Sequence, residues 1–201
     1  MNWELFGTTF VTLFVIMDPL GTVPIFLGLT SRFTALERIR AARQAVFVAF
    51  GVIVVFAVFG QRILDYLNIS LPALQAAGGL LLLLIALDLL TGKGDEPTST
   101  VGVNVALVPL GTPLLAGPGA IVATMVFVQQ SSGWDDRVAI TLGVVAVHIT
   151  LYLAMRFAAI VLHVLGGSGV MLVTRIAGLL LSAIAVQLMA DAVMAFVAVE
   201  N

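Results

Sequence analysis

The chain has 201 residues, of which 61% are hydrophobic and 10% charged, with a mean hydropathy of +1.16 and a formal net charge of −2. Soluble domains average about 45–50% apolar and about 25% charged residues, so this composition indicates an integral membrane protein. The small net charge gives no indication of a nucleic-acid partner, and the absence of cysteine excludes disulfides and thiol chemistry.

Six segments are apolar enough to cross a bilayer, which takes about 20 apolar residues. In chain order they cover residues 5–29, 44–64, 71–90, 104–128, 138–162 and 170–198. The connections between them are short. We therefore expect an all-α membrane protein with a single transmembrane domain over residues 1–201, surrounded by lipid.

The first segment contains two prolines, Pro19 and Pro24, with Asp18 directly before them and Gly21 and Thr22 between them. A helix that carries two prolines must break, because proline lacks a backbone donor and clashes with the preceding turn. A central aspartate costs about 2.5–3.5 kcal/mol on insertion scales, so Asp18 should face protein or water. It either caps a half-helix that starts at Pro19 or also titrates or meets a cation or ammonium group, and the two interpretations are compatible.

The basic residues of the loops predict the orientation. The first and third loops, which lie on one side of a six-span protein, hold five of the nine basic residues: Arg32, Arg38, Arg40, Arg43 and Lys93. That side should be the cytoplasm. Both termini then lie on the outer, periplasmic side of the cell inner membrane.

The fourth segment repeats the proline spacing of the first, 94 residues later. It contains Thr112, Pro113, Gly117, Pro118 and Gly119. Broken helices in a bilayer are tolerated only where protein or a cavity satisfies the backbone, and a matched pair of breaks is the best sequence pointer to a transporter site. Half-helix N-termini suit a carboxylate, and Asp18 suits an ammonium group, so a small zwitterion such as a neutral amino acid fits both. The glycines alternatively allow only close helix crossing.

Three further polar residues inside the spans are candidates for ion coupling together with Asp18: His148, Gln187 and Asp191. A lone histidine in an apolar span is also explained as a satisfied core residue. Gln187 is expected to face the helix bundle.

Internal similarity extends beyond the prolines. At an offset of 99 residues, seven of eleven positions from Gly79 to Leu89 are identical to those from Gly178 to Leu188. Each half, about 1–92 and about 103–201, holds three predicted spans, so the halves must cross the membrane in opposite directions. The sequence thus predicts a 3+3 inverted repeat with helices 1 and 4 broken at the midplane.

Three stretches make the chain resemble the MarC family of six-span membrane proteins, which is grouped with the LysE-type exporters. They run from Asp18 to Pro24, from Thr112 to Ile121 and from Arg175 to Leu180. The resemblance implies ion-coupled transport of small neutral amino acids such as glycine and alanine, with substrate at the breaks around 18–24 and 112–119. H⁺ and Na⁺ are both candidate coupling ions, no metal or cofactor is implied, and small residues along several spans permit a homodimer.

Alternative functions are an exporter of drugs or other small metabolites and a non-transporting membrane assembly subunit. The low aromatic content of 8% argues against a large drug cavity. An intramembrane enzyme is disfavoured, because the sequence shows no metal-binding His-Glu-x-x-His motif and no Ser/His arrangement.

Overall fold

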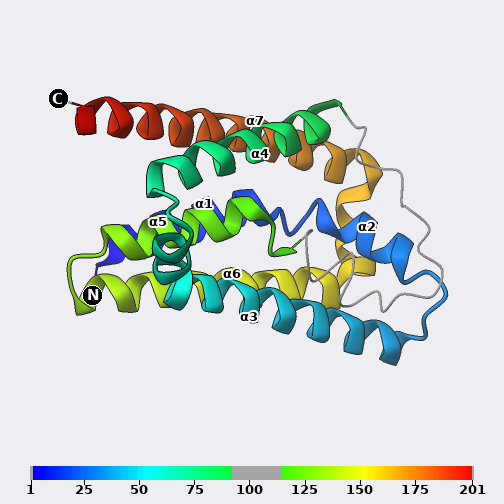
Figure 1. Cartoon of the computed structure of the whole chain (residues 1–201). Coiled ribbons are helices and arrows are strands. Elements are labelled where there is room, and N and C mark those ends of the chain that lie inside the picture. Colours follow the sequence, from blue (N-terminus) through cyan, green and yellow to red (C-terminus); the bar gives the residue numbers. More distant parts are fainter. Residues whose placement is uncertain (1, 92–114, 201) are drawn as a thin grey trace.

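The computed structural model describes residues 2–91 and 115–200, and within them the predicted all-helical class is confirmed. The helices are α1 (Trp3–Met17), α2 (Thr22–Leu29), α3 (Ala35–Leu67), α4 (Leu71–Thr91), α5 (Pro118–Gln130), α6 (Trp134–Arg156) and α7 (Ala158–Glu200) (Figure 1). Four of them, α3, α4, α6 and α7, are long and apolar enough to cross a membrane, and α1 with α2 forms a fifth candidate span bent by 46°. Residues 104–114 of the predicted fourth span lie outside the described residues, so the six-span count stays a prediction.

The helix starts follow from local capping. The Thr34 hydroxyl accepts a hydrogen bond from Glu37 N at 3.4 Å, and Glu37 Oε2 accepts one from Thr34 N at 2.8 Å, which forms a capping box at the start of α3. Asn2 caps α1 by accepting from Leu5 N at 3.0 Å, and its side-chain amide donates to Asp136 Oδ1 at 2.9 Å. The second bond ties the start of α1 to the start of α6.

The helices pack as a long antiparallel pair, α4 and α7, above a group formed by α1, α3, α5 and α6 (Figure 1). Within the second group, α1 packs mainly on α6, and α5 packs on α3. The two groups are connected by α5, which also contacts α4, and by α2, α1 and α6, which contact α7.

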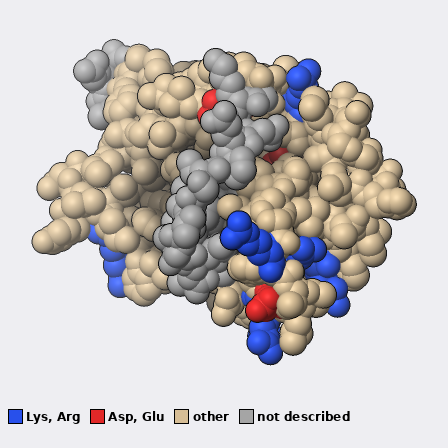
Figure 2. All heavy atoms as spheres, turned by 90° about the vertical axis from the view of Figure 1, so that its right-hand side faces the viewer, with Lys and Arg blue, Asp and Glu red and all other residues tan. Residues whose placement is uncertain are grey.

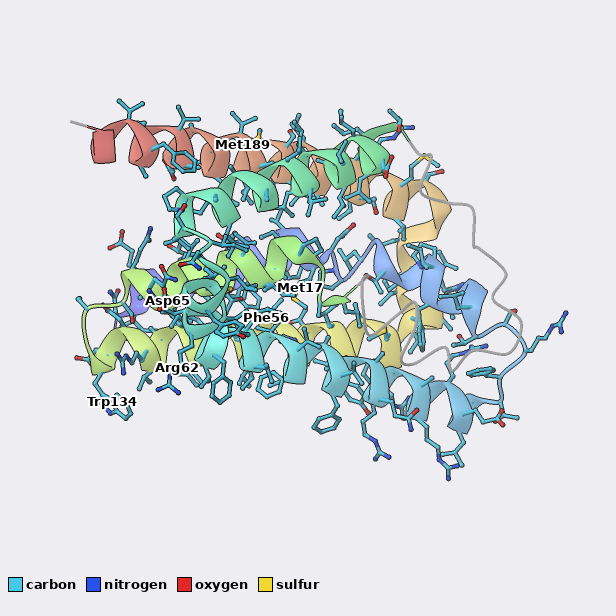
Figure 3. All side chains as sticks on the ribbon, viewed as in Figure 1. Met17, Phe56, Arg62, Asp65, Trp134 and Met189 are labelled. Atoms are coloured by element: carbon cyan, nitrogen blue, oxygen red, sulfur yellow. The ribbon has the colours of Figure 1, made fainter. Side chains whose placement is uncertain are left out.

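The two ends of the bundle differ in charge. Figure 1 places both chain termini at one end and the connection between α2 and α3 at the other. Figure 2 views the latter end, where Arg side chains gather in its lower part. Arg62, Asp65 and Trp134 lie at the opposite end (Figure 3). The first loop and these residues therefore lie at opposite ends of the bundle, whereas the side that faces the cytoplasm stays a prediction.

Two glycines let α4 and α7 approach closely. A Cβ atom added to Gly79 would stand 2.8 Å from the carbonyl oxygen of Ala185, and one added to Gly178 would stand 3.2 Å from that of Ala86. Both offsets between equivalent residues are 99, the spacing of the sequence repeat. The contact of Gly79 with Ala185 is therefore repeated by the contact of Gly178 with Ala86, the residues that the 99-residue offset relates to them.

The boundary between the last two predicted spans differs from the structure. The predicted fifth span covers residues 138–162, but α6 ends at Arg156 and α7 begins at Ala158. Helix α7 then bends at Gly166, whose φ of +65° lies in the left-handed region that glycine tolerates best. Hydropathy alone missed the boundary, because Arg156 is a single charge between two otherwise apolar stretches.

Candidate functional site

The break between α1 and α2 is centred on Asp18. Its backbone adopts φ +37° and ψ 72°, a left-handed conformation that ends α1, and its N–H donates to Phe14 O at 3.0 Å. Aspartate is one of the few non-glycine residues that visit this region. The chain therefore leaves the α1 axis at Asp18, before either proline.

The Asp18 carbonyl and carboxylate both bind the start of the next helix. The carbonyl oxygen accepts hydrogen bonds from Thr22 N at 3.0 Å and from the Thr22 hydroxyl at 2.9 Å. Carboxylate Oδ1 accepts from Gly21 N at 3.0 Å. The predicted capping role of Asp18 is thus present, but α2 begins at Thr22 and not at Pro19, because residues 19–21 form a turn. Pro24 lies in the first turn of α2, where a missing N–H costs nothing.

The second carboxylate oxygen has no such partner. Asp18 is only 9% exposed, and its Oδ2 receives no hydrogen bond from any residue that the structure describes. A buried carboxylate oxygen without a donor is costly, so it marks a place where a ligand proton donor or a cation is favourable.

A residue that the sequence did not indicate, Thr174 of α7, borders this carboxylate. A Cβ atom added to Gly21 would stand 2.8 Å from Asp18 Cγ and 2.9 Å from Thr174 Oγ1. The carboxylate and the hydroxyl therefore converge over the bare backbone of Gly21. The available sequence signal was weak, namely a hydroxyl residue directly before Arg175 in an apolar span.

The start of α5, which follows the predicted second break, packs near the end of α1. Gly117 is the N-cap of α5 and Pro118 its first residue, while Thr112 and Pro113 lie outside the described residues. Leu115 and Ala120 belong to the same buried cluster as Met17 and Val23, which flank the first break. Figure 3 labels Met17 beside the start of α5. Helices α2 and α5 both begin in the middle of the bundle and run toward opposite ends (Figure 1).

The two helix N-termini differ in what they offer a ligand. At α2, the N–H groups of Gly21, Thr22 and Val23 all donate to residues 18–20, and Pro24 has none. The N-terminus of α5 carries no side-chain cap. The sequence suggested that both half-helices present free N–H groups, but in the structure Asp18 and its neighbours satisfy those of α2.

The remaining coupling candidates lie elsewhere. Gln187 donates to Asp191 Oδ1 at 2.7 Å, and these residues are 13 and 17 positions beyond Thr174, about 20–25 Å further along α7. Gln187 is exposed, so the expectation that it faces the bundle is wrong. Its side-chain amide instead donates to Asp191, one turn further along α7. His148 is buried in α6 against Phe50 of α3. No three His, Asp or Glu side chains within the described ranges are grouped to hold a metal ion.

Comparison with known proteins places this architecture in one family. Residues 3–197 match the family described as "MarC family integral membrane protein". A UPF0056 membrane protein of Methanocaldococcus jannaschii is 37% identical over 200 residues, covering 96% of this chain and 98% of the relative. UPF0056 membrane proteins of Archaeoglobus fulgidus and Bacillus subtilis are 35% and 34% identical, covering 92% and 88% of this chain and 91% and 88% of the relatives. No solved structure matches the chain.

Proposed function

The chain belongs to the MarC family of integral membrane proteins, and on that basis we propose that it is a secondary transporter of small neutral amino acids, of the glycine and alanine class. One observation carries the proposal: Asp18 is buried at a helix break inside an apolar bundle and keeps one carboxylate oxygen without a described donor. An ionisable residue inside a membrane helix is a functional-site candidate by default, and substrate and ion pathways are among the sites that such residues mark.

The amino group of the substrate binds at the first break. An ammonium group at Asp18 Oδ2 replaces an unsatisfied buried oxygen by a charge-assisted hydrogen bond, which is about twice as strong as a neutral one. Thr174 Oγ1 lies on the same side of Gly21 and offers an acceptor for a second ammonium proton.

The carboxylate of the substrate binds at the second break. The start of α5 has the partial positive charge of a helix N-terminus and no side-chain cap. Pro118 has no N–H, and the N–H groups of Ala120 and Ile121 donate to Gly117 O, which leaves the N–H of Gly119 for the substrate, whereas at α2 the Asp18 carboxylate already binds the helix N-terminus. The residues around it are small or apolar, among them Ala116, Gly117 and Ala120. Such walls favour glycine and alanine over substrates with larger or polar side chains.

Movement follows from the proposed inverted repeat. The reciprocal contacts of Gly79 with Ala185 and of Gly178 with Ala86 support a two-fold relation between the halves, because residues related by the 99-residue offset exchange places. Alternating access in such folds is rocking of one repeat against the other around a central site. Coupling to H⁺ or Na⁺ then takes place at Asp18, which either binds the ion or takes up the proton.

The purified protein in liposomes tests the proposal. We expect uptake of radiolabelled glycine and alanine, driven by a gradient of either H⁺ or Na⁺ imposed separately. Asp18→Asn should abolish gradient-driven uptake, whereas Asp88→Asn, which removes the same charge from an exposed position of α4, should leave it near wild type. Equal loss in both variants, or full activity of Asp18→Asn, would contradict the assignment of Asp18. Absence of any amino acid uptake by wild-type protein would refute the function itself.

A further inference from the structure

A side chain of α4, Leu82, packs directly on the start of α5. A Cβ atom added to Gly119, the second residue of α5, would overlap Leu82 Cδ2 and would stand 2.5 Å from its Cγ and 3.0 Å from its Cδ1. The atoms nearest to that position therefore all belong to Leu82. Because Gly119 has no side chain, Leu82 reaches the backbone at the N-terminus of the helix.

Leu82 is buried from all sides. It is only 1% exposed, and it belongs to the same buried cluster as Val15 of α1 and Leu181 of α7. Val15 lies in the last turn of α1, directly before the break at Asp18, so this cluster extends to the first break. Protein interiors are packed as densely as organic crystals, so Leu82 has little room to move aside. It thus occupies a fixed volume at the start of α5, where the proposed substrate binds.

Gly21 and Gly119 lie against walls of opposite polarity. A Cβ atom added to Gly21 would meet the Asp18 carboxylate and the Thr174 hydroxyl, whereas one added to Gly119 would meet aliphatic carbons of Leu82. The polar wall suits the ammonium group of an amino acid. The N–H of Gly119 donates to no residue that the structure describes, so it is open to the substrate carboxylate. The carboxyl carbon is bonded to the α-carbon, so the α-carbon and its substituent then come close to Leu82.

We propose that Leu82 is the residue that sets the upper size limit of the substrate, an inference that rests on the proposed function. With the ammonium group at Asp18 and the carboxylate at Gly119, the substituent of the α-carbon faces the Leu82 side chain. The hydrogen of glycine and the methyl group of alanine are small enough to fit beside it. A branched side chain such as that of valine needs volume that Leu82 fills.

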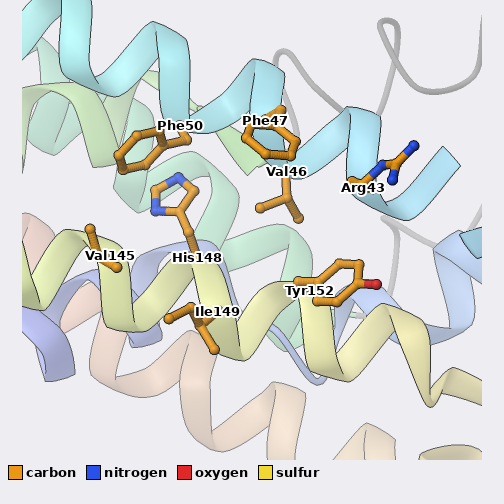
Figure 4. Close-up of a pocket in the computed structure, with 8 residues that line it drawn as sticks. All are labelled: Arg43, Val46, Phe47, Phe50, Val145, His148, Ile149 and Tyr152. Carbon is orange, nitrogen blue, oxygen red and sulfur yellow. The ribbon is translucent and has the colours of Figure 1, made fainter. Parts of the chain in front are cut away.

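A hollow elsewhere in the bundle gives an alternative place for a substrate side chain. It has a volume of about 400 Å³ and is lined by side chains of α3 and α6, among them Phe50, His148 and Ile149 (Figure 4). The described residues that line it all belong to these two helices, so it is separate from Asp18 and Gly119. Truncating a side chain of this hollow therefore serves as a control.

The ratio of Vmax/KM for valine to Vmax/KM for glycine, measured for the full-length protein in liposomes, tests the inference. Leu82→Ala removes Cγ, Cδ1 and Cδ2 and leaves a cavity, because the buried residues around it relax only partly. Valine, whose side chain is larger than that of alanine by two methyl groups, should fit this cavity. The ratio should rise about tenfold or more, since one methylene in an apolar pocket changes discrimination about 10–200-fold. A purely structural defect would lower both uptake rates and leave the ratio unchanged.

Two matched truncations locate the effect. Leu181→Ala makes the same change at the residue that the 99-residue offset relates to Leu82, in the same cluster and at 0% exposure, but on α7, whereas α5 packs mainly on α1, α3, α4 and α6. Ile149→Ala enlarges the hollow between α3 and α6. Both should leave the ratio unchanged. An equal rise in Leu181→Ala would show general loosening of the cluster, and a rise in Ile149→Ala would place the substrate side chain in the hollow; either result would overturn the inference.

Two further variants test the contact with Gly119 and the size of the change. Gly119→Ala, added to Leu82→Ala, places a methyl group in the cavity from the opposite side, so the ratio should fall toward the wild-type value. If Leu82→Ala does not fold, Leu82→Val removes a single carbon and should admit 2-aminobutyrate, which is one carbon larger than alanine, while leucine stays excluded. A wild-type substrate range in the folded variant would overturn the inference and leave the proposed function intact. Absence of glycine uptake by the wild-type protein would refute both.

Discussion

Replacing Gly21 by alanine tests the central geometry of the break. The added Cβ atom overlaps the position of Asp18 Oδ2, and it would also stand 2.8 Å from Asp18 Cγ and 2.9 Å from Thr174 Oγ1. The carboxylate must therefore rotate away, and its 3.0 Å hydrogen bond from Gly21 N is lost. Overpacking costs about 1–3 kcal/mol, and a hydrogen bond to a charged group is worth about 1.5–3 kcal/mol, so we expect a loss of about 2.5–6 kcal/mol in the free energy of unfolding.

Titration with SDS in mixed micelles measures this loss, with two comparisons. Gly28→Ala makes the same change in α2 at an exposed position where the new Cβ meets no described atom within 4 Å, so it should be neutral or stabilise by up to about 1 kcal/mol. In an Asp18→Gly background, which keeps the left-handed conformation without a carboxylate, Gly21→Ala should cost less than about 1 kcal/mol, because the Thr174 hydroxyl can rotate. An equal cost in both backgrounds would refute the proposed overlap with Asp18.

Three further predictions address the scaffold and the substrate. Gly79→Ala and Gly178→Ala should each destabilise by about 1–3 kcal/mol in the same SDS titration, because both new Cβ atoms press on backbone oxygens of the opposite helix, and a cost at only one of them would contradict the reciprocal packing. Gly166→Ala should cost about 1–2 kcal/mol through its positive φ alone, whereas Gly167→Ala, equally free of contacts with described atoms, should not be destabilising; equal effects would show that the bend does not depend on glycine. In competition assays, ethylamine should inhibit glycine uptake by wild type but not bind the Asp18→Asn variant in thermal-shift measurements, and retained binding would argue against Asp18 as the ammonium partner.

Local features of this protein were more predictable than contacts between distant segments. Pro19 and Pro24 indicated a break because the effect of proline is confined to its own turn, and Asp18 was recognised as a capping residue for the same reason. The start of α2 at Thr22 was missed because it depends on the left-handed backbone of Asp18. Thr174 was missed because only the packing of α7 on α2 brings it to Gly21, and no local pattern encodes that contact.

The break at Asp18 and the start of α5 are unequal in chemistry, and this inequality gives the proposed site a direction. At the first break the Asp18 side chain and backbone satisfy the helix N–H groups and leave one carboxylate oxygen open. At the second break the N-cap is Gly117, which has no side chain to compete for the helix N-terminus. A zwitterion placed between α2 and α5 therefore has one favourable orientation, with its ammonium group toward Asp18 and its carboxylate toward α5. A scaffold with two equivalent breaks would bind an amino acid equally well in either orientation.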